Sequence, residues 1–522
     1  MWKVPAPSLW RKIKMSFELK GNYFDGTYQM PVIDTLRNTV KVIKKNNPSN
    51  TSERLWELTV DYNCIEDVIN SSLQGHELWR KTSTSERIEY LSRFKEAVQL
   101  KQDEIARAIA LETGKPLWES MTEAKALSAK VDVTINKSLK RINKQQFSDI
   151  MPNTDGQINY KPIGPCFVIG PFNFPCHLAN GQILNALIAG NSIIFKPSEK
   201  TCYSGQLLID CFHQAGFPKG VINLIQGDGE TASRITKNKN IKGVFFTGSK
   251  EVGLKILENT YKDLSKLVAL ELGGKNTSII HQDANLDLVL PELLKACFMT
   301  TGQRCVSTSL VPIHEGIADQ FIEKFHSYTK RLVIDHPIDH SEVPFMGPLI
   351  DEASLKNYLN YMGMAKREGF EEVMRGKQLE KSFPGHYVTP SIHLGSMSHL
   401  ENSIFISSEL FGPNCTFVKY KEIEEAIQVA NHSEYGLAGS VFTQDKTIQD
   451  LCIRDIEVGQ FNINRSTVGA SSALPFGGVK SSGNYRPAAV SFIDSCSYPQ
   501  SSLELKEVAL EDPDKITGVG KA

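Results

Sequence analysis

Short apolar strands alternate with helical segments between residues 158 and 246, and this alternation restricts the possible folds more than any other sequence feature. Strands are predicted at residues 165–170, 192–195, 221–225 and 244–246, with helices at 184–189 and 204–215. Such an alternation is typical of βαβ units, in which the strands lie parallel in one sheet. Ligands of these sheets bind beyond the carboxyl ends of the strands, so the motifs that follow the strands are candidate site residues.

Length and composition place the chain among ordinary globular proteins of two or three domains. It has 522 residues, of which 41% are hydrophobic and 22% charged, and its formal net charge is −1. This balance argues against nucleic acid as the main partner. No apolar run reaches the roughly 18 residues that a membrane span needs, so no membrane partner is expected. The ten cysteines are scattered and no histidines cluster, so we expect neither a metal site nor a disulfide framework, and a reducing cytoplasm fits.

We interpret both ends of the chain as extensions. Helices are predicted after the N-terminal extension. Residues 1–17 carry four basic side chains and no acid, so we interpret them as a disordered basic extension, with a transit peptide as the alternative. Residues 506–522 form a polar tail. A capping box at Ser83 and Glu86 begins a helix that is predicted to continue to Gly114, and a second helix is predicted at residues 118–136.

Three residues are candidates for catalysis. Cys305 follows a Gly-Gln turn, where a thiol can face a cleft, although a single cysteine is more often a small buried hydrophobic residue. Glu271 lies in an apolar stretch before two glycines, and a carboxylate there is either a general base or one half of a salt bridge. Asn173 lies among aromatic residues and prolines, where its amide is either a turn cap or a donor to an oxyanion.

Two glycine-containing segments and one strand end are candidates for binding a dinucleotide. Residues 246–253 follow a strand and open a helix, and residues 227–232 do so more loosely, with a plain tight turn as the alternative. Lys196 and Glu199 follow the strand at 192–195. A carboxylate at this edge can accept a hydrogen bond from a ribose hydroxyl and would repel a 2′-phosphate, which favours NAD over NADP.

The second half of the chain repeats an α/β pattern. A strand is predicted at 415–420, a helix at 422–431 and a further strand at 440–442. Residues 473–484 are rich in glycine and serine, and we interpret them as a flexible surface loop.

Seven motifs, in this order, resemble the aldehyde dehydrogenase superfamily over roughly residues 18–505. They are GPFNFP at 170–175, KPSE at 196–199, FTGS at 246–249, ELGG at 271–274, GQRC at 302–305, ELFGP at 409–413 and PFGG at 475–478. Within the superfamily, CHLANG at 176–181, SGNYRP at 482–487 and SYPQSSLE at 497–504 look closest to the branch that oxidises N-succinylglutamate 5-semialdehyde in arginine catabolism.

The resemblance implies an α/β architecture with a Rossmann-like, parallel-sheet NAD-binding domain, an α/β catalytic domain and a small β oligomerisation flap. The implied boundaries are 18–270 for the NAD-binding domain, 271–460 for the catalytic domain, 461–483 for a return to the cofactor domain and 484–505 for an oligomerisation strand that pairs with residues 140–160. A homodimer or homotetramer is implied as well.

The resemblance also assigns roles. Cys305 would be the nucleophile, Asn173 would hold the oxyanion and Glu271 would activate water. The implied cofactor residues are Lys196, Glu199, Gly248, Ser249, Lys250, Glu251, Val252, Gly253, Glu409 and Phe411.

The resemblance implies a small aldehyde as the substrate, and the identity of that aldehyde follows only from the branch that the chain looks closest to. Succinylglutamate semialdehyde carries two carboxylates, for which Arg465 and Arg486 are the candidate partners, each being equally interpretable as part of a structural salt bridge. The alternatives are another aldehyde, acyl transfer to coenzyme A instead of water, and an inactive binding protein. Glu271 argues against coenzyme A, because that reaction needs no base for water.

Overall fold

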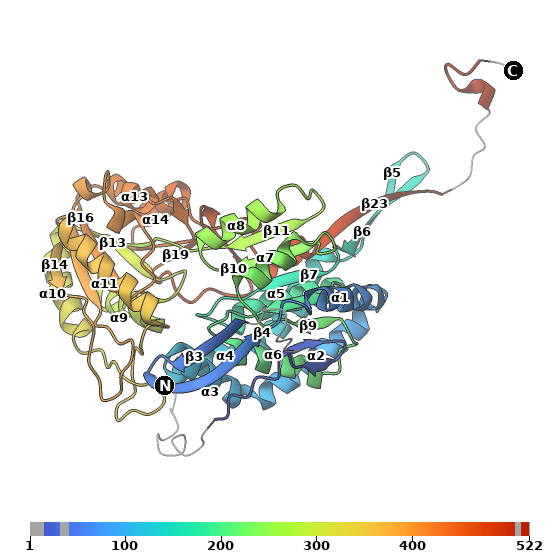
Figure 1. The fold of residues 1–522 in the computed structure, drawn as a ribbon. Helices are drawn as coiled ribbons and strands as arrows, with labels where there is room; N and C mark the ends of the chain where they lie inside the picture. The colour runs from blue at the N-terminus through green and yellow to red at the C-terminus, as the bar shows by residue number, and fades with distance from the viewer. Residues whose placement is uncertain (1–14, 32–40, 507–512, 521–522) are drawn as a thin grey trace.

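The computed structural model describes residues 15–31, 41–506 and 513–520. They form two α/β lobes and a long arm that projects from one of them (Figure 1). Residues 1–14 of the predicted basic extension lie outside the described residues, as do residues 507–512 and 521–522 of the predicted polar tail. Within the described part, no helix combines the length and the apolar character that crossing a membrane requires.

The first lobe is built on a seven-stranded sheet. Its order is β11 (Leu267–Glu271), β10 (Gly243–Thr247), β7 (Cys166–Ile169), β8 (Ile193–Lys196), β9 (Ile222–Leu224), β1 (Asn22–Phe24) and β2 (Thr27–Gln29). The five strands from β11 to β9 run parallel, whereas β1 is antiparallel to its neighbours. The parallel sheet that the alternation predicts is therefore confirmed.

Helices cover this sheet and supply most of its core. They are α1 (Ile65–Trp79), α2 (Thr84–Leu100), α3 (Gln102–Thr113), α4 (Leu117–Val133), α5 (His177–Ala189), α6 (Cys202–Gln214), α7 (Gly229–Lys237) and α8 (Lys250–Thr260). Their apolar faces and the strands form two buried clusters, one that includes residues of α2 to α6 and one that includes residues of α1, α7 and α8. Each fully buried aliphatic or aromatic side chain contributes about 1.5–3 kcal/mol. A hairpin of β3 (Lys41–Asn47) and β4 (Asn50–Val60) packs beside α3.

One helix prediction needs correction, and one helix was missed. The helix that begins at the Ser83 capping box ends at Leu100, because Lys101 leaves the helical conformation at φ −96° and ψ 6°. The break separates α2, which packs on α4, α5 and α6, from α3, which packs on α4, α6 and β3. Helix α1 was not predicted, and its first turn has no side-chain cap that the sequence could reveal.

The second lobe contains another seven-stranded sheet. Its order is β14 (Glu371–Met374), β15 (Ser391–Gly395), β16 (Asn414–Tyr420), β13 (Thr308–His314), β12 (Asn276–Ile280), β18 (Ala438–Phe442) and β19 (Gln460–Ile463). All pairs are parallel except β14 with β15. The helices of this lobe are α9 (Leu286–Phe298), α10 (Glu315–Thr329), α11 (Glu352–Arg367), α12 (Ile404–Ser407), α13 (Ile423–Asn431) and α14 (Lys446–Asp455).

The crossings between the lobes lie near one another. The chain passes from β11 to β12 through residues 272–275. The return was expected from residue 461, but β19 still pairs with β18 at the edge of the second sheet. Contact with the first sheet resumes at Gly483, which forms a bridge with Glu271.

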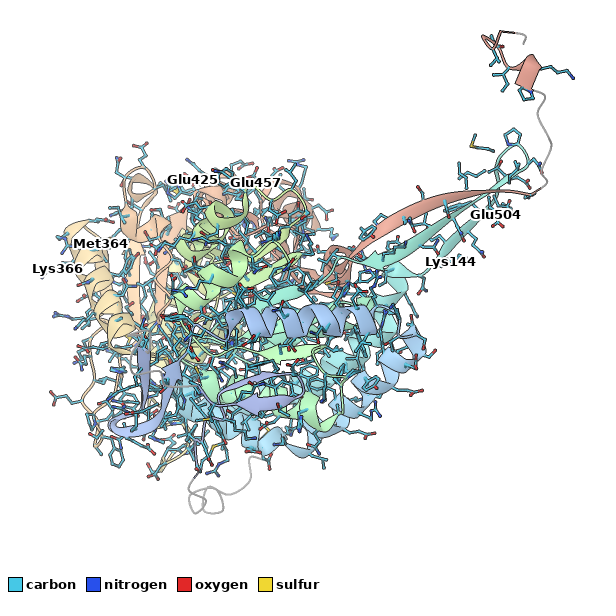
Figure 2. All side chains as sticks on the ribbon, turned by 45° about the vertical axis from the view of Figure 1, so that its right-hand side comes forward. Lys144, Met364, Lys366, Glu425, Glu457 and Glu504 are labelled. Atoms are coloured by element: carbon cyan, nitrogen blue, oxygen red, sulfur yellow. The ribbon has the colours of Figure 1, made fainter. Side chains whose placement is uncertain are left out.

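The arm consists of three antiparallel strands. They are β5 (Gln145–Met151), β6 (Thr154–Pro162) and β23 (Ser497–Leu505), with Ser497 opposite Pro162 and Leu505 opposite Thr154. Figure 2 places Lys144 and Glu504 on this arm, away from both lobes. Several large apolar side chains of the arm are exposed, namely Phe147, Ile150, Met151, Tyr498, Leu503 and Leu505.

Residues 476–484, which we name the strap, are packed against β11, so the prediction of a flexible surface loop at 473–484 is wrong. The Ser482 hydroxyl is buried and donates to the carbonyl of Gly273 at 2.7 Å, and the Leu272 N–H donates to the carbonyl of Ser482 at 2.9 Å. Gly483 has φ +140°, and a Cβ there would stand 2.2 Å from the carbonyl oxygen of Leu270. The small residues allow the backbone of the strap to approach that of residues 270–273 closely, and they do not indicate mobility.

Candidate active site

Cys305 lies on a loop between α9 and β13 whose backbone is held in an uncommon conformation. Thr300, Thr301 and Gly302 have φ values of 56°, 56° and 70°. A β-branched residue in this region costs on the order of 1–3 kcal/mol and persists only where surrounding contacts enforce it. The loop therefore needs strong anchors.

Glu119 of α4 supplies the main anchor. Its carboxylate accepts hydrogen bonds from the N–H and the hydroxyl of Thr300, and it pairs with Arg304 at 2.6 Å. Arg304 also donates to the Thr300 hydroxyl at 2.8 Å. On the far side of the thiol, the Asn276 amide donates to the carbonyl of Cys305 at 2.7 Å. Both sides of Cys305 are thus fixed.

Asn173 is joined to the same loop. Its side-chain amide donates to the carbonyl of Gln303 at 2.9 Å, and its side-chain oxygen accepts from the N–H of Phe174 at 3.0 Å. The bond to the Gln303 carbonyl uses one of the two amide protons. The other remains available to an oxyanion formed near Cys305.

Glu271 ends β11 and is almost completely buried, with 1% of its surface exposed. Neither carboxylate oxygen has a hydrogen-bond partner of standard geometry. Burial raises the pKa of Glu271 well above its usual value, and the N–H of Gly478 in the strap offsets this only in part. A carboxylate in such a setting has proton affinity suited to a general base.

Cys305, unlike Glu271, is partly exposed. Burial in the cavity wall, followed by the charges of Glu271 and Glu409, raises the pKa of the thiol, while Arg304 opposes the shift. A thiol with a raised pKa is protonated at neutral pH. Its attack on a carbonyl therefore requires a base to accept the proton.

One cavity of about 1240 Å³ brings nearly all of the predicted site residues together. Its lining includes Asn173, Lys196, Glu199, Gly248, Ser249, Lys250, Glu251, Val252, Glu271, Cys305, Glu409 and Phe411. Gly253 is not among the lining residues, because it packs against Leu272, whose Cδ2 would stand 2.9 Å from a Cβ at position 253. The cavity exceeds the roughly 300–1,000 Å³ of sites for drug-sized ligands, so a dinucleotide and a small substrate can fit together.

The two helix starts at this cavity differ in what they can bind. At the start of α7 the Asp228 carboxylate accepts from the N–H groups of Glu230 and Thr231, both at 3.1 Å, so a phosphate is disfavoured there. At the start of α8 the cap is the neutral hydroxyl of Ser249, which accepts from the Val252 N–H at 3.4 Å. Only α8 therefore offers free N–H groups and a positive dipole end to a phosphate. The tight-turn interpretation of residues 227–232 fits better than the phosphate loop.

The neighbouring residues fit the remainder of a dinucleotide. Lys196 is buried, with its ammonium 3.7 Å from the carboxylate of Glu199, and the Glu199 side chain is 45% exposed toward the cavity. At the other end, Glu409 accepts from the Gly274 N–H at 3.0 Å. Burial raises the pKa of Glu409 to about 7. Phe411 lies edge-on to Phe172 at 5.8 Å.

The two arginines proposed for the substrate lie elsewhere. Arg465 and Arg486 are both exposed, and neither belongs to the cavity lining. Arg465 reaches the carbonyl of Gly469 at 3.5 Å.

Several lining residues were not anticipated from the sequence. They are Asn357, Tyr361, residues 400–404, His432, Glu434 and Tyr435, which come from α11 and from loops of the second lobe. No motif marks them, because only the packing of the two lobes brings them to the cavity. Among the described residues, no group of three or more histidine, cysteine, aspartate or glutamate side chains could hold a metal ion.

Comparison with protein families gives one match that covers most of the chain. The family model described as "Aldehyde dehydrogenase family" matches residues 36–501. The chain is 33% identical over 459 residues to an N-succinylglutamate 5-semialdehyde dehydrogenase of Vibrio cholerae, which covers 87% of this chain and 92% of the relative. It is 34% identical over 489 residues to the protein of that name from Legionella pneumophila, with 93% and 95% covered.

Solved structures agree with this match. Betaine aldehyde dehydrogenase from Staphylococcus aureus in complex with NAD⁺ superposes with a TM-score of 0.88 at 26% identity, covering 99% of each chain. 1-Pyrroline-5-carboxylate dehydrogenase from Thermus with bound NAD gives a TM-score of 0.85 at 25% identity, covering 93% of each chain.

Proposed function

The chain belongs to the aldehyde dehydrogenase family, and from this premise we propose that it oxidises N-succinyl-L-glutamate 5-semialdehyde to N-succinyl-L-glutamate. It is an NAD-dependent aldehyde dehydrogenase. The identity of the aldehyde and the roles of individual residues are the proposed part.

The observation that carries the mechanism is that the buried carboxylate of Glu271, whose oxygens have no hydrogen-bond partner of standard geometry, shares one cavity with the Cys305 thiol. Cys305 Sγ forms a bond to the aldehyde carbon as its proton passes to a base, and the carbonyl π bond becomes an oxyanion. The side-chain amide of Asn173 and the backbone N–H of Cys305 donate to that oxyanion. Preorganised donors of this kind contribute about 10²–10³ in rate each.

The second half of the reaction needs a hydride acceptor and a water molecule. NAD, when bound, supplies the acceptor. Loss of the hydride leaves Cys305 holding the acyl group as a thioester. Glu271 then takes a proton from water as the oxygen forms its bond to the thioester carbon, and the carbon–sulfur bond breaks to release the carboxylic acid and the thiol.

The dinucleotide would be held by residues from both lobes. We assign its ribose to Lys196 and Glu199, its pyrophosphate to the start of α8 from Gly248 to Gly253, and the nicotinamide end to Glu409 and Phe411. Gly253 would act through the packing of α8 on Leu272, since it does not line the cavity.

The proposed substrate rests on the two curated relatives. Both are N-succinylglutamate 5-semialdehyde dehydrogenases, and both match nearly the whole chain. Arg465 and Arg486 remain predictions for the substrate carboxylates, and their exposed positions would place such a contact at the surface around the site.

Assembly and location are proposed on separate grounds. The exposed apolar side chains of the arm support a homodimer or homotetramer, in which a second copy would cover them. The ten cysteines are free thiols, which supports a cytoplasmic location.

A panel of aldehydes followed by NADH absorbance tests the proposed substrate. N-Succinylglutamate 5-semialdehyde should show the highest kcat/KM, above succinic semialdehyde, betaine aldehyde and propanal. A higher value for any of the other three would reassign the substrate.

Cys305→Ser tests the mechanism with the same assay. We expect oxidation to be abolished while NAD affinity stays close to the wild-type value in calorimetry, because the thiol is not needed to hold the dinucleotide. Cys64→Ser is the matched control, since Cys64 is another partly exposed free thiol and lies outside the cavity lining. Retention of more than a few per cent of activity by Cys305→Ser would remove this residue from the central role.

A further inference from the structure

A buried lysine without a counter-charge lies between α4 and α5. Lys130 of α4 is 5% exposed, and among the described residues no ion pair or hydrogen bond is found for its ammonium group. Burial alone accounts for the lowering of its pKa to about 8. The contrast with Lys115 is direct, because that buried lysine pairs with Glu123 at 2.7 Å. An unpaired buried ammonium is costly, so it requires an explanation.

The position of Lys130 relates it to the catalytic cavity through α5. Its ammonium nitrogen stands 2.6 Å from the point where a Cβ on Gly181 would lie. Gly181 follows Leu178 by three residues and His177 by four, so the three share one face of α5. Leu178 lines the cavity that contains Cys305. The Lys130 ammonium therefore lies about one helical turn, roughly 5 Å, from a wall residue of that cavity.

His177 offers a second nitrogen on this face. Its ring is partly exposed, but its Nδ1 is buried and has no hydrogen-bond partner. Burial, and then the charges of Lys130 and Lys115, hold the pKa of His177 well below its usual value. The imidazole is therefore neutral and can donate one N–H without adding charge.

The other groups along α5 do not neutralise Lys130. The side-chain oxygens of Asn180 and Asn185 are buried without partners. They can share ammonium protons, but they carry no net charge. The start of α5 is already occupied by Glu123, which accepts from the N–H groups of Cys176 and His177 at 3.1 Å each and is committed to Lys115. The positive charge of Lys130 is left for a ligand.

We propose that Lys130, together with His177, binds a carboxylate of the aldehyde substrate and so selects acidic semialdehydes. This inference rests on the function proposed above and assigns the specificity to a site inside the protein, on the cavity side of α5. Gly181 is part of the device, because any side chain there would occupy the place of the ammonium group. Neither Lys130 nor His177 is among the residues that line the cavity, so the substrate carboxylate would reach them beside Leu178.

Lys130→Met removes the charge while keeping an unbranched, apolar side chain. We expect KM for N-succinylglutamate 5-semialdehyde to rise roughly ten- to a hundredfold, because a charge-assisted hydrogen bond is lost. KM for propanal and for NAD should change little, and kcat for propanal should be retained. Lys125→Met is the matched control, since it makes the same substitution on the exposed face of α4 and should leave both aldehydes unaffected.

Gly181→Ala keeps the charge and moves it. The added Cβ would push the flexible ammonium end aside, so the same selective rise in KM should appear at smaller size. If Lys130→Met does not fold, the KM values of Gly181→Ala for the acidic and the uncharged aldehyde test the proposal instead. Equal losses on the acidic and the uncharged aldehyde, or no loss on either, would overturn the inference.

The wild-type enzyme separates this inference from the proposed substrate. A preference for a different acidic aldehyde would overturn the assignment of N-succinylglutamate semialdehyde, and Lys130→Met should then weaken that other preference. A preference for acidic aldehydes that persists in both variants would overturn the role of Lys130 alone. If the wild type had equal kcat/KM values for acidic and uncharged aldehydes, both the proposed substrate and the role of Lys130 would be overturned.

Discussion

The helical layer of the first lobe and the end of β11 both bury carboxylates, but they treat them differently. Glu119 and Glu123 of α4 are each paired with a cation and accept backbone N–H groups. Glu112 of α3 accepts from the Trp56 indole at 2.7 Å and from the N–H groups of Tyr203 and Ser204. Glu271, equally buried, has no partner of standard geometry.

The difference teaches that burial alone does not mark a catalytic carboxylate. Where the partners are complete, the group stabilises the fold, and its neutral replacement leaves donors unsatisfied. Where partners are missing, the ionised group costs stability and holds its proton affinity for a reaction. Substitution of glutamate by glutamine should therefore have opposite consequences in the two regions.

Glu271→Gln should give the largest effect, and it falls on turnover. A neutral amide cannot take a proton from water, so the steady-state rate should drop by about 10²–10⁴. Rapid mixing should show about one NADH per active site before the slow phase, since Cys305 and the oxyanion donors are intact. The melting temperature should be unchanged or raised, because an unpartnered buried carboxylate is removed. If Glu271→Gln kept full turnover, or had a clearly lowered melting temperature, Glu271 would not differ from the paired carboxylates of the helical layer.

Glu119→Gln should act mainly on stability. It leaves the Arg304 guanidinium without its anion, and breaking a buried pair in this way costs about 3–5 kcal/mol. Urea unfolding would measure the loss, and Glu96→Gln on the exposed side of α2 should stay within about 0.5 kcal/mol of wild type. A free energy of unfolding as high as that of wild type would show that Glu119 does not hold the Cys305 loop.

The pH dependence of stability should differ in sign between the two carboxylates, as a smaller effect. The folded-state pKa of Glu271 is raised, so its contribution relative to glutamine is fully present below the unfolded pKa of about 4.5 and is lost as pH rises through the folded value. Wild type should thus lose stability relative to Glu271→Gln toward alkaline pH.

Glu119 should show the reverse. Burial by itself would raise its pKa, but Arg304 and Lys115 outweigh burial and lower it. Its contribution is therefore present above the unfolded pKa and is lost as pH falls through the folded value. Melting temperatures of wild type and both variants between pH 2 and pH 9 would measure both trends. Parallel curves for the two variants would contradict the assignment of opposite shifts.

The sequence predicted the parts of the molecule in which local pattern and tertiary structure agree. The parallel strands are apolar and bounded by turns, and the motifs at their carboxyl ends reach the cavity as expected. It failed where one composition serves two purposes. A segment rich in glycine and serine, such as residues 476–484, can be a mobile loop or a segment whose backbone closely approaches another backbone. Only the contact with β11 shows that the second case applies here.

The sequence alone also does not show which charged side chains pair with one another. Nothing local shows that Glu119 meets Thr300, 181 residues away, or that Lys130 meets no carboxylate among the described residues. Asn357, Tyr361 and residues 400–404 of the cavity wall lie in no motif for the same reason. Pairing across the lobes is a property of packing, and it decides which charged residues are scaffold and which are reactive.

The contacts of the strap with residues 270–273 can form only late in the synthesis of the chain. Ser482 closes over Gly273, which precedes it by 209 residues. At about 5–20 residues per second, a ribosome needs roughly 10–40 s to produce that interval. Until then the nascent chain contains Glu271 and Cys305 but lacks the hydrogen bonds that the strap makes with Leu272 and Gly273. A chain whose synthesis stops before residue 482 therefore lacks these contacts beside β11 altogether.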